Sequence, residues 1–156
     1  MKIGIISDTH GLLRPEAVAA LRGVDWILHA GDFGSAEVLA AVRALAPEGC
    51  FTGVRGNVDR GAWAQTLPER EWVEVGSKAI YMLHDLQELD LQPATAGVSV
   101  VISGHSHQPR VEHRADGVLY LNPGSAGPRR FRLPVSLALL TIHSDGALEA
   151  RIKELL

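Results

Sequence analysis

The chain has little cysteine, few aromatic residues, no long apolar run and no excess of positive charge. Cys50 is the single cysteine among 156 residues. It excludes an internal disulfide and is typical of a protein from a reducing compartment. No run approaches the ~18 apolar residues of a membrane span, and the apolar part of the N-terminal stretch is too short for a secretory signal. We therefore expect a cytoplasmic protein that makes no use of a membrane.

The composition bounds the size and the partners of the protein. The net charge of -3 excludes the broad positive field that binds long nucleic acid. Apolar residues make up 46% and charged residues 21%, which is ordinary for a globular protein. A chain of this length buries enough surface for a core of its own, so we expect one domain over residues 1–156.

Short apolar or β-branched runs bounded by turn residues recur along the chain, as is typical of strands. They cover residues 2–7, 25–30, 50–55, 71–76, 78–83, 98–103, 117–122 and 135–142. The stretch 147–155 fits either a strand or a helix. Helices are expected over 14–23, where Pro15 suits the first turn, and over 35–49, where Ser35 suits the N-cap. The irregular stretch 85–97 has room for a short helix.

The order of these elements predicts how the strands pair. The first half alternates strand and helix, which favours parallel strands joined by helical crossovers. The second half is mostly strands, which suggests an added antiparallel portion, with a tight hairpin turn at 76–78. The fold class expected is therefore α/β.

Polar side chains follow these apolar runs with unusual regularity. Seven of them carry carboxylate, amide or imidazole groups: Asp8, His10, Asp32, Asn57, His84, His105 and His107. In open α/β sheets, ligands bind beyond the carboxyl ends of strands. Because residues two apart on a strand point to the same side, we expect Asp8 to converge with His10, and His105 with His107.

These residue types suit transition metals. Imidazole with carboxylate and amide oxygen favours Mn²⁺, Fe, Zn²⁺ or Ni²⁺ over an all-oxygen Mg²⁺ or Ca²⁺ site. Seven ligands are too many for one tetrahedral ion. They are about right for two ions that lie ~3.5–4 Å apart and share a carboxylate.

The order of the motifs adds a family resemblance. The motifs are D-x-H at 8–10, G-D at 31–32, G-N at 56–57, a lone His84 and G-H-x-H at 104–107. Each alone is weak, but the five in this order resemble the calcineurin-like metallophosphoesterases. The later N-P-G-S at 122–125 and the small size resemble the YfcE-type branch of single-domain phosphodiesterases. The resemblance runs from Asp8 to about Pro134.

The resemblance implies a fold, a ligand set and a reaction. The fold would be a four-layer α-β-β-α sandwich of two mixed sheets. The first ion would be held by Asp8, His10 and His107, and the second by Asn57, His84 and His105. Asp32 would bridge two divalent ions, with Mn²⁺ expected ahead of Ni²⁺, Fe or Zn²⁺. The substrate would be a small phosphodiester or nucleotide-like molecule. The resemblance is compatible with either a monomer or a homo-oligomer.

The charge of such a centre indicates the substrate. Two divalent ions, two carboxylates and a bridging hydroxide leave a charge of about +1, which suits a phosphodiester monoanion. The ions would lower the pKa of bound water from ~15.7 towards ~7 and so supply that hydroxide as the nucleophile. Asp32, Asn57, His84 and His105 would then act in catalysis as ligands, because a metal-bound imidazole nitrogen cannot take a proton.

The segment after Gly56 departs from the family pattern. In many members a histidine at the position of Val58 assists the leaving group, and valine has no proton with which to do so. We expect Gly56 to let the backbone turn sharply and Asp59 to support the loop rather than bind metal. Asp85 stands where glycine is common, and it could orient His84 or lower the positive charge of the site.

Other polar residues have plainer interpretations. His29 lies inside a predicted strand, and a hydrogen-bonded core histidine is favoured over a role beside the metals. His113 and His143 are expected on the surface. Asn122 and Ser125 are expected to brace the metal ligands, because metal-bound histidines need supporting hydrogen bonds.

Two other functions compete with a phosphodiesterase. A phosphomonoesterase would need extra cations for its dianionic substrate, and Arg129, Arg130 and Arg132 are candidates, although a solvated basic loop or a dimer contact fits them too. The other is a catalytically weak protein-binding scaffold, because the retromer scaffold subunit resembles the same family. The intact ligand set argues against the scaffold.

Overall fold

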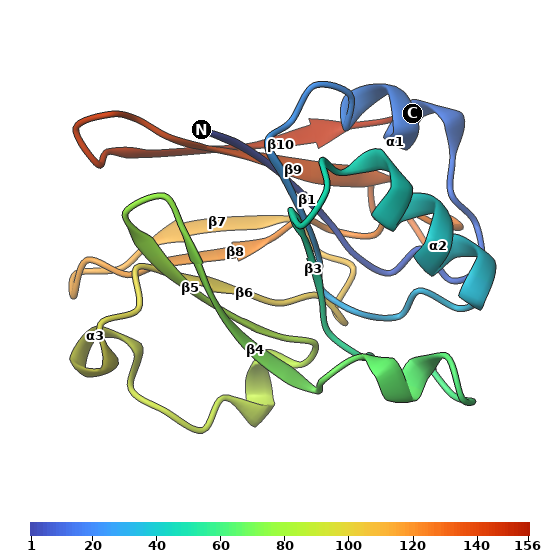
Figure 1. Cartoon of the computed structure of the whole chain (residues 1–156), viewed down its shortest axis with the longest axis horizontal. Helices are drawn as coiled ribbons and strands as arrows, with labels where there is room; N and C mark the ends of the chain where they lie inside the picture. The colour runs from blue at the N-terminus through green and yellow to red at the C-terminus, as the bar shows by residue number, and fades with distance from the viewer.

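Ten strands form two five-stranded sheets in the computed structural model, which describes residues 1–156 (Figure 1). The first sheet has the order β10-β9-β1-β2-β3 and the second β4-β5-β6-β8-β7. The strands of the first sheet are β1 (Lys2–Ile6), β2 (Trp26–His29), β3 (Phe51–Gly53), β9 (Ser136–Ile142) and β10 (Leu148–Glu154). Those of the second are β4 (Arg70–Val75), β5 (Lys78–Leu83), β6 (Val100–Ile102), β7 (Arg110–His113) and β8 (Leu119–Asn122).

The first sheet follows the predicted β-α-β-α-β order. β1, β2 and β3 are parallel, with Leu28 opposite Ile5 on one side and Thr52 on the other. β9 runs antiparallel to β1, and β10 runs antiparallel to β9. The stretch that fitted either a strand or a helix is therefore strand β10, because it pairs with β9 along its whole length.

The two crossover helices are shorter than predicted. α1 (Pro15–Ala20) has Pro15 in its first turn and gives way to a turn at Gly23, where φ is 77°. α2 (Ala36–Leu45) begins as predicted, because the Ser35 Oγ accepts the Val38 N–H at 3.2 Å. It ends early because Ala46 precedes a proline and is extended, with ψ at 150°.

The second sheet is mixed rather than antiparallel. Its centre, β5-β6-β8, is parallel, and only the edge strands β4 and β7 are antiparallel to their neighbours. The predicted antiparallel portion is therefore present at β4-β5, β7-β8 and β9-β10, but the core of the second sheet is parallel. The hairpin turn between β4 and β5 is confirmed. A short helix, α3 (Pro93–Ala96), and a 3₁₀ turn, η2 (Leu86–Glu88), lie within residues 85–97.

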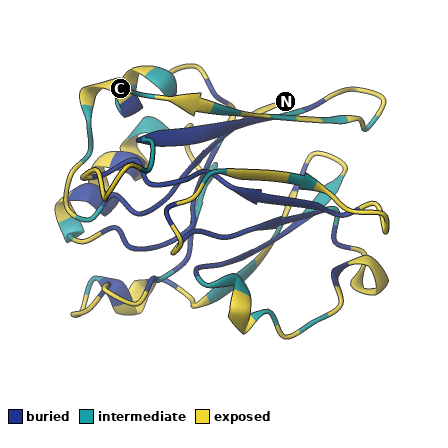
Figure 2. Cartoon of the chain, turned by 180° about the vertical axis from the view of Figure 1, so that it is seen from behind, coloured by how far each residue is buried: buried dark blue, intermediate teal, exposed yellow.

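The core is built in layers. Fully buried side chains from the inner faces of both sheets, such as Ile5, Ile102 and Leu140, form the central cluster. α1 and α2 cover the outer face of the first sheet, where Leu21 and Val42 join a second cluster. The segment that contains η2 packs against the outer face of the second sheet. Figure 2 shows the buried strands within an exposed rim of loops. The predicted four-layer α-β-β-α sandwich is confirmed.

The parallel strands place the candidate residues. Three parallel strands in each sheet, β1, β2 and β3 in one and β5, β6 and β8 in the other, lead at their carboxyl ends into loops rich in polar groups. No helix has the length and apolar character needed to cross a membrane.

Candidate metal centre

The loops after five parallel strands bring the seven candidate ligands to one place. Asp8 and His10 follow β1, Asp32 follows β2, Asn57 follows β3, His84 follows β5, and His105 and His107 follow β6. Backbone hydrogen bonds tie these loops together. The Asp8 N–H donates to the Gly31 carbonyl at 3.0 Å, and the Gly104 N–H donates to the His84 carbonyl at 2.9 Å.

One group of ligand atoms is formed by Asp8, His10 and His107. The Asp8 Oδ1 lies 3.3 Å from the His107 Nε2 and 3.6 Å from the His10 Nε2. The two Nε2 atoms are 3.2 Å apart. Atoms that share one ion at bonds of 2.0–2.2 Å lie about 3.0–3.5 Å apart, so this group has the spacing of co-ligands.

A second group is formed by Asp8, Asp32 and His84. The Asp32 Oδ2 lies 3.1 Å from the His84 Nε2 and 3.7 Å from the His10 Nε2. Asp32 therefore stands between a histidine of each predicted ion set. That is the position that a bridging carboxylate requires.

Asn57 and His105 lie at the exposed side of the centre. The Asn57 Oδ1 is 3.2 Å from the His105 Nδ1, and the His105 ring meets the His84 ring edge-on at 5.1 Å. The expectation that His105 converges with His107 was wrong, because His107 faces Asp8 while His105 faces Asn57. Both residues lie beyond the end of β6, so the alternation of strand side chains does not apply to them.

Two buried polar atoms point into the centre with no hydrogen-bond partner, the Asp8 Oδ1 and the His84 Nε2. The other atom of each group is held: the Asp8 Oδ2 accepts from the Ser7 Oγ at 2.6 Å, and the His84 Nδ1 donates to the Ala30 carbonyl at 2.7 Å. Metal ligands typically show this division, with one atom braced by the protein and one left for the ion. The residues therefore fit divalent ions. His107 is the exception, because its buried Nδ1 has no hydrogen-bond partner in the protein.

The backbone is strained at the same residues. Six non-glycine residues have a positive φ, and five of them are candidate ligands. Their φ values run from 46° to 69°, and the set is Asp8, His10, Asp32, His105 and His107. Such conformations are uncommon outside glycine and cluster at functional sites, where the surrounding structure enforces them.

The carboxylates hold a proton on His84 in the absence of ions. Burial opposes ionisation of Asp8, but the neighbouring His10 and His107 imidazoles keep its pKa well below the usual range. Burial likewise opposes ionisation of Asp32, and His84 lowers that pKa. Burial disfavours charge on His84, yet Asp32 and Asp8 raise its pKa to about 9. A divalent ion would therefore displace a proton from His84.

Asp59 supports the loops instead of facing the centre. Its buried carboxylate accepts the N–H groups of Asp32 at 2.9 Å, Gly34 at 3.0 Å and Gly56 at 2.9 Å. Its neighbour Val58 donates its own N–H to the Asp32 Oδ1 at 3.0 Å, and the Val58 side chain is 41% exposed. The loop thus fixes Asp32 from two sides.

Asn122 and Ser125 contact the loops that carry the ligands. The Asn122 Nδ2 donates to the Gly104 carbonyl at 2.9 Å, and the Ser125 Oγ donates to the Asp8 carbonyl at 2.8 Å. Gly56 acts differently from the expectation. Its φ is not positive, and glycine is needed because a Cβ would overlap the Asp32 Oδ1.

His29 is a core histidine, as favoured from the sequence. It is fully buried, its Nδ1 accepts the Gly31 N–H at 3.1 Å, and its ring stacks on Phe33 at 3.6 Å. Burial lowers its pKa to about 3, so the ring stays neutral. His113 and His143 are exposed, as predicted.

Asp85 faces His105 rather than His84. Its Oδ1 accepts the Gln87 N–H at 3.0 Å, and its Oδ2 lies 3.9 Å from the His105 Nε2. Asp85 makes no contact with His84, so of its two roles left open the structure does not support the orientation of His84.

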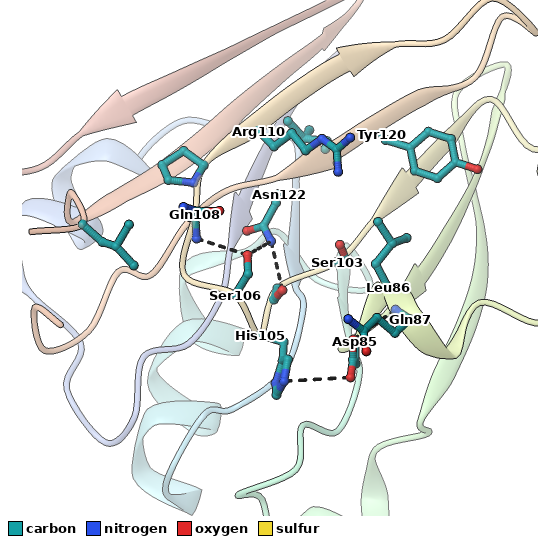
Figure 3. Close-up of a pocket in the computed structure, with 14 residues that line it drawn as sticks. Asp85, Leu86, Gln87, Ser103, His105, Ser106, Gln108, Arg110, Tyr120 and Asn122 are labelled. Atoms are coloured by element: carbon teal, nitrogen blue, oxygen red, sulfur yellow. Dashed lines mark hydrogen bonds and ion pairs between the residues drawn. The ribbon is translucent and has the colours of Figure 1, made fainter. Parts of the chain in front are cut away.

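A cleft of about 830 Å³ opens beside the centre, and the candidate ligand His105 and its neighbour Asp85 line it (Figure 3). Its wall includes Ser106, Gln108 and Arg110. A smaller hollow of about 230 Å³ lies against Asn57, His84 and His105. Composition and motif spacing gave no signal for the larger cleft, because most of its wall comes from residues outside the motifs.

Comparison with known proteins decides the family. The model of the calcineurin-like phosphoesterase superfamily domain matches residues 1–145. The chain belongs to this superfamily. The predicted family is thereby confirmed, and with it an enzyme of the metal-dependent phosphoesterase class.

Two curated proteins resemble the chain over most of its length. A probable metallophosphoesterase of Methanothermobacter thermautotrophicus is 39% identical, over 94% of this chain and 87% of that protein. A phosphodiesterase of Methanocaldococcus jannaschii is 32% identical, over 80% of this chain and 83% of that protein.

Solved structures share the fold over complete chains. The phosphoesterase YfcE of E. coli has a TM-score of 0.72 at 20% identity, with 100% of both chains covered. Vps29 of Entamoeba histolytica, solved in complex with zinc, has a TM-score of 0.72 at 25% identity with the same coverage.

Proposed function

We propose that this protein is a phosphodiesterase that uses two divalent ions. Asp8, His10 and His107 would hold one ion, Asn57, His84 and His105 would hold the other, and Asp32 would be shared by both. The position of the Asp32 Oδ2 between the His10 and His84 nitrogens carries this proposal. The phosphodiesterase of M. jannaschii supports the choice of substrate bond.

The chain's own residues prepare the centre. When bound, the ions would neutralise phosphoryl oxygens and activate water for attack. Ser7 and Val58 fix the two carboxylates and the Ala30 carbonyl fixes the His84 ring, so that little reorganisation accompanies ion binding. The two ionised carboxylates reduce the charge of the centre, which favours a diester monoanion over a dianion.

Mn²⁺ is the ion proposed, because mixed imidazole and oxygen ligands suit it. The zinc complex of the Entamoeba protein makes Zn²⁺ the first competitor. We further propose a small diester substrate, a single domain over residues 1–156 and action in the cytoplasm.

The test is hydrolysis of bis(p-nitrophenyl) phosphate with Mn²⁺. Asp32→Ala and His105→Ala should each lower kcat/KM more than about 100-fold, beyond the loss typical of supporting residues. Asp145→Asn, a change in an exposed turn, should keep the wild-type rate. Wild-type turnover no higher than that of Asp32→Ala would refute the proposal.

Two further candidates each rest on one observation. The fold shared with Vps29 favours a protein-binding scaffold. Fewer than one tightly bound ion per chain, together with no turnover, would support the scaffold. The exposed Arg129, Arg130 and Arg132 favour a phosphomonoesterase. Higher kcat/KM for p-nitrophenyl phosphate than for the diester would support that function.

A further inference from the structure

The loop over residues 128–133, between β8 and β9, carries the one strained non-glycine residue outside the candidate ligands. Phe131 has a φ of 54° and is 92% exposed. A left-handed conformation costs energy for a residue with a side chain, and exposure of a phenyl ring loses the benefit of burial. Strain of this kind marks functional positions. The other five non-glycine residues with a positive φ are all proposed metal ligands.

The same loop carries three exposed cations. Arg129, Arg130 and Arg132 flank Phe131, and none of their guanidinium groups forms an ion pair or hydrogen bond within the chain. The protein as a whole has a net charge of -3. A local excess of unpaired arginine in an acidic protein points to an anionic ligand, because guanidinium binds phosphate through paired hydrogen bonds.

The base of the loop is attached to the candidate metal centre. Gly127 packs so closely on the Thr9 carbonyl that a Cβ would overlap it, and the Arg14 Nε donates to the Gly127 carbonyl at 3.1 Å. At the other end, Leu133 lines the large cleft. Four residue steps span at most ~14 Å, so the Phe131 Cα stays within that distance of the Gly127 Cα. The loop therefore borders both the centre and the cleft.

The cleft itself has neither a free aromatic face nor a free cation. Apart from the imidazole of His105, its one aromatic ring is Tyr120, which is covered by the Arg114 guanidinium at 3.5 Å. Its arginine, Arg110, is paired with Glu112. Gln108 and Ser106 give it hydrogen-bonding groups, as Figure 3 shows. The aromatic and cationic groups missing from the cleft are those that the loop presents at its rim.

We propose that this loop recognises a nucleotide within the substrate, an inference that rests on the proposed function. The diester would carry, beside its scissile phosphate, an aromatic base and a further phosphate group. Phe131 stacks on the base, and the three arginines bind the additional phosphate. Hydrogen-bonding groups of the sugar lie along Gln108 and Ser106 in the cleft.

Binding of a nucleotide that cannot be cleaved tests the loop without turnover. The probe is adenosine 5′-(α,β-methylene)diphosphate, titrated by calorimetry into the Mn²⁺-loaded protein. Phe131→Ala should raise Kd about tenfold, within the range measured for loss of a base–aromatic stack. Replacement of the three arginines by glutamine should raise Kd by at least as much and weaken the dependence on salt. Phe131→Tyr should bind like the wild type.

Exposed residues elsewhere supply the controls. Arg22→Gln with Arg151→Gln removes exposed charge away from the loop and should leave Kd unchanged. Phe131→Gly should weaken binding without lowering Tm, because it relieves strain and removes no buried contact. A purely structural phenylalanine would instead lower Tm when removed. Equal Kd in wild type and all loop variants would overturn the proposal.

Kinetics separate this inference from the proposed function. Phe131→Ala should raise KM for the p-nitrophenyl ester of thymidine 5′-monophosphate and leave methyl p-nitrophenyl phosphate unaffected. Hydrolysis of both esters with no change in the variant would overturn the loop proposal alone. Hydrolysis of neither, with the contrast in nucleotide binding intact, would refute only the phosphodiesterase. Binding to phosphatidylglycerol vesicles that depends on Phe131, without any nucleotide effect, would assign the loop to a lipid surface and overturn the proposal.

Discussion

Replacement of Asp59 by alanine tests how the centre is held in place. Its carboxylate is 5% exposed and accepts three backbone N–H groups, from Asp32, Gly34 and Gly56. A hydrogen bond to a charged group contributes about 1.5–3 kcal/mol. With the lower figure for each bond, because water can enter a loop, the free energy of unfolding should fall by about 4.5 kcal/mol. For a domain of this size that corresponds to a Tm lower by about 9–18 °C.

Urea unfolding followed by circular dichroism, with a chelator present, measures this loss apart from any stabilisation by bound metal. Asp59→Asn keeps one oxygen acceptor and should lose about half as much. Asp145→Ala is the matched control, because that carboxylate accepts one N–H in an exposed turn, and it should lose less than about 1 kcal/mol. An Asp59→Ala protein no less stable than Asp145→Ala would refute the supporting role.

Three further predictions concern the centre itself. Val58→His should raise turnover of an alkyl diester more than that of a nitrophenyl diester, because only the alkoxide, a poor leaving group, needs a proton donor. Equal effects on both diesters would show that Val58 does not limit the chemistry. In the metal-free protein His84, with its pKa raised to about 9, stabilises the fold fully below its unfolded value near 6.5, and this contribution is lost as pH rises through 9. The difference in unfolding free energy between wild type and His84→Gln should therefore shrink by on the order of 3 kcal/mol from pH 6.5 to 9.5, and a constant difference would contradict the ion pair. Gly56→Ala should destabilise by about 1–3 kcal/mol and weaken ion binding, because its Cβ overlaps the Asp32 Oδ1; an unchanged urea midpoint would show that the loop can move aside.

The sequence predicted where the strands end better than how they assemble. Polar residues after β1, β2 and β3 were recognisable, because the apolar runs before them are short and the glycine motifs are regular. The division into two sheets came from the family resemblance alone, since pairing between distant segments leaves no local pattern. β7 was missed because Arg-Val-Glu-His lies on an exposed edge, with no buried face to impose an apolar alternation.

The site shows the same limit. Residue types and motif order picked out the candidate residues that the loops bring together, but the positive φ at Asp8, His10 and Asp32 has no signature in the side chains. The interval of two residues suggested that His105 and His107 converge, whereas the loop after β6 sends them to different partners. The strain at Phe131 was likewise invisible, although the arginines around it were noted.

The number of Mn²⁺ ions bound per chain tests the central claim most directly. Equilibrium dialysis followed by elemental analysis should find two ions per wild-type chain, two in Asp145→Asn and at most one in Asp32→Ala, because loss of the bridging carboxylate removes a ligand from both ions. A wild-type chain that binds fewer than two ions, or an Asp32→Ala chain that keeps both with unchanged affinity, would contradict a centre bridged by Asp32.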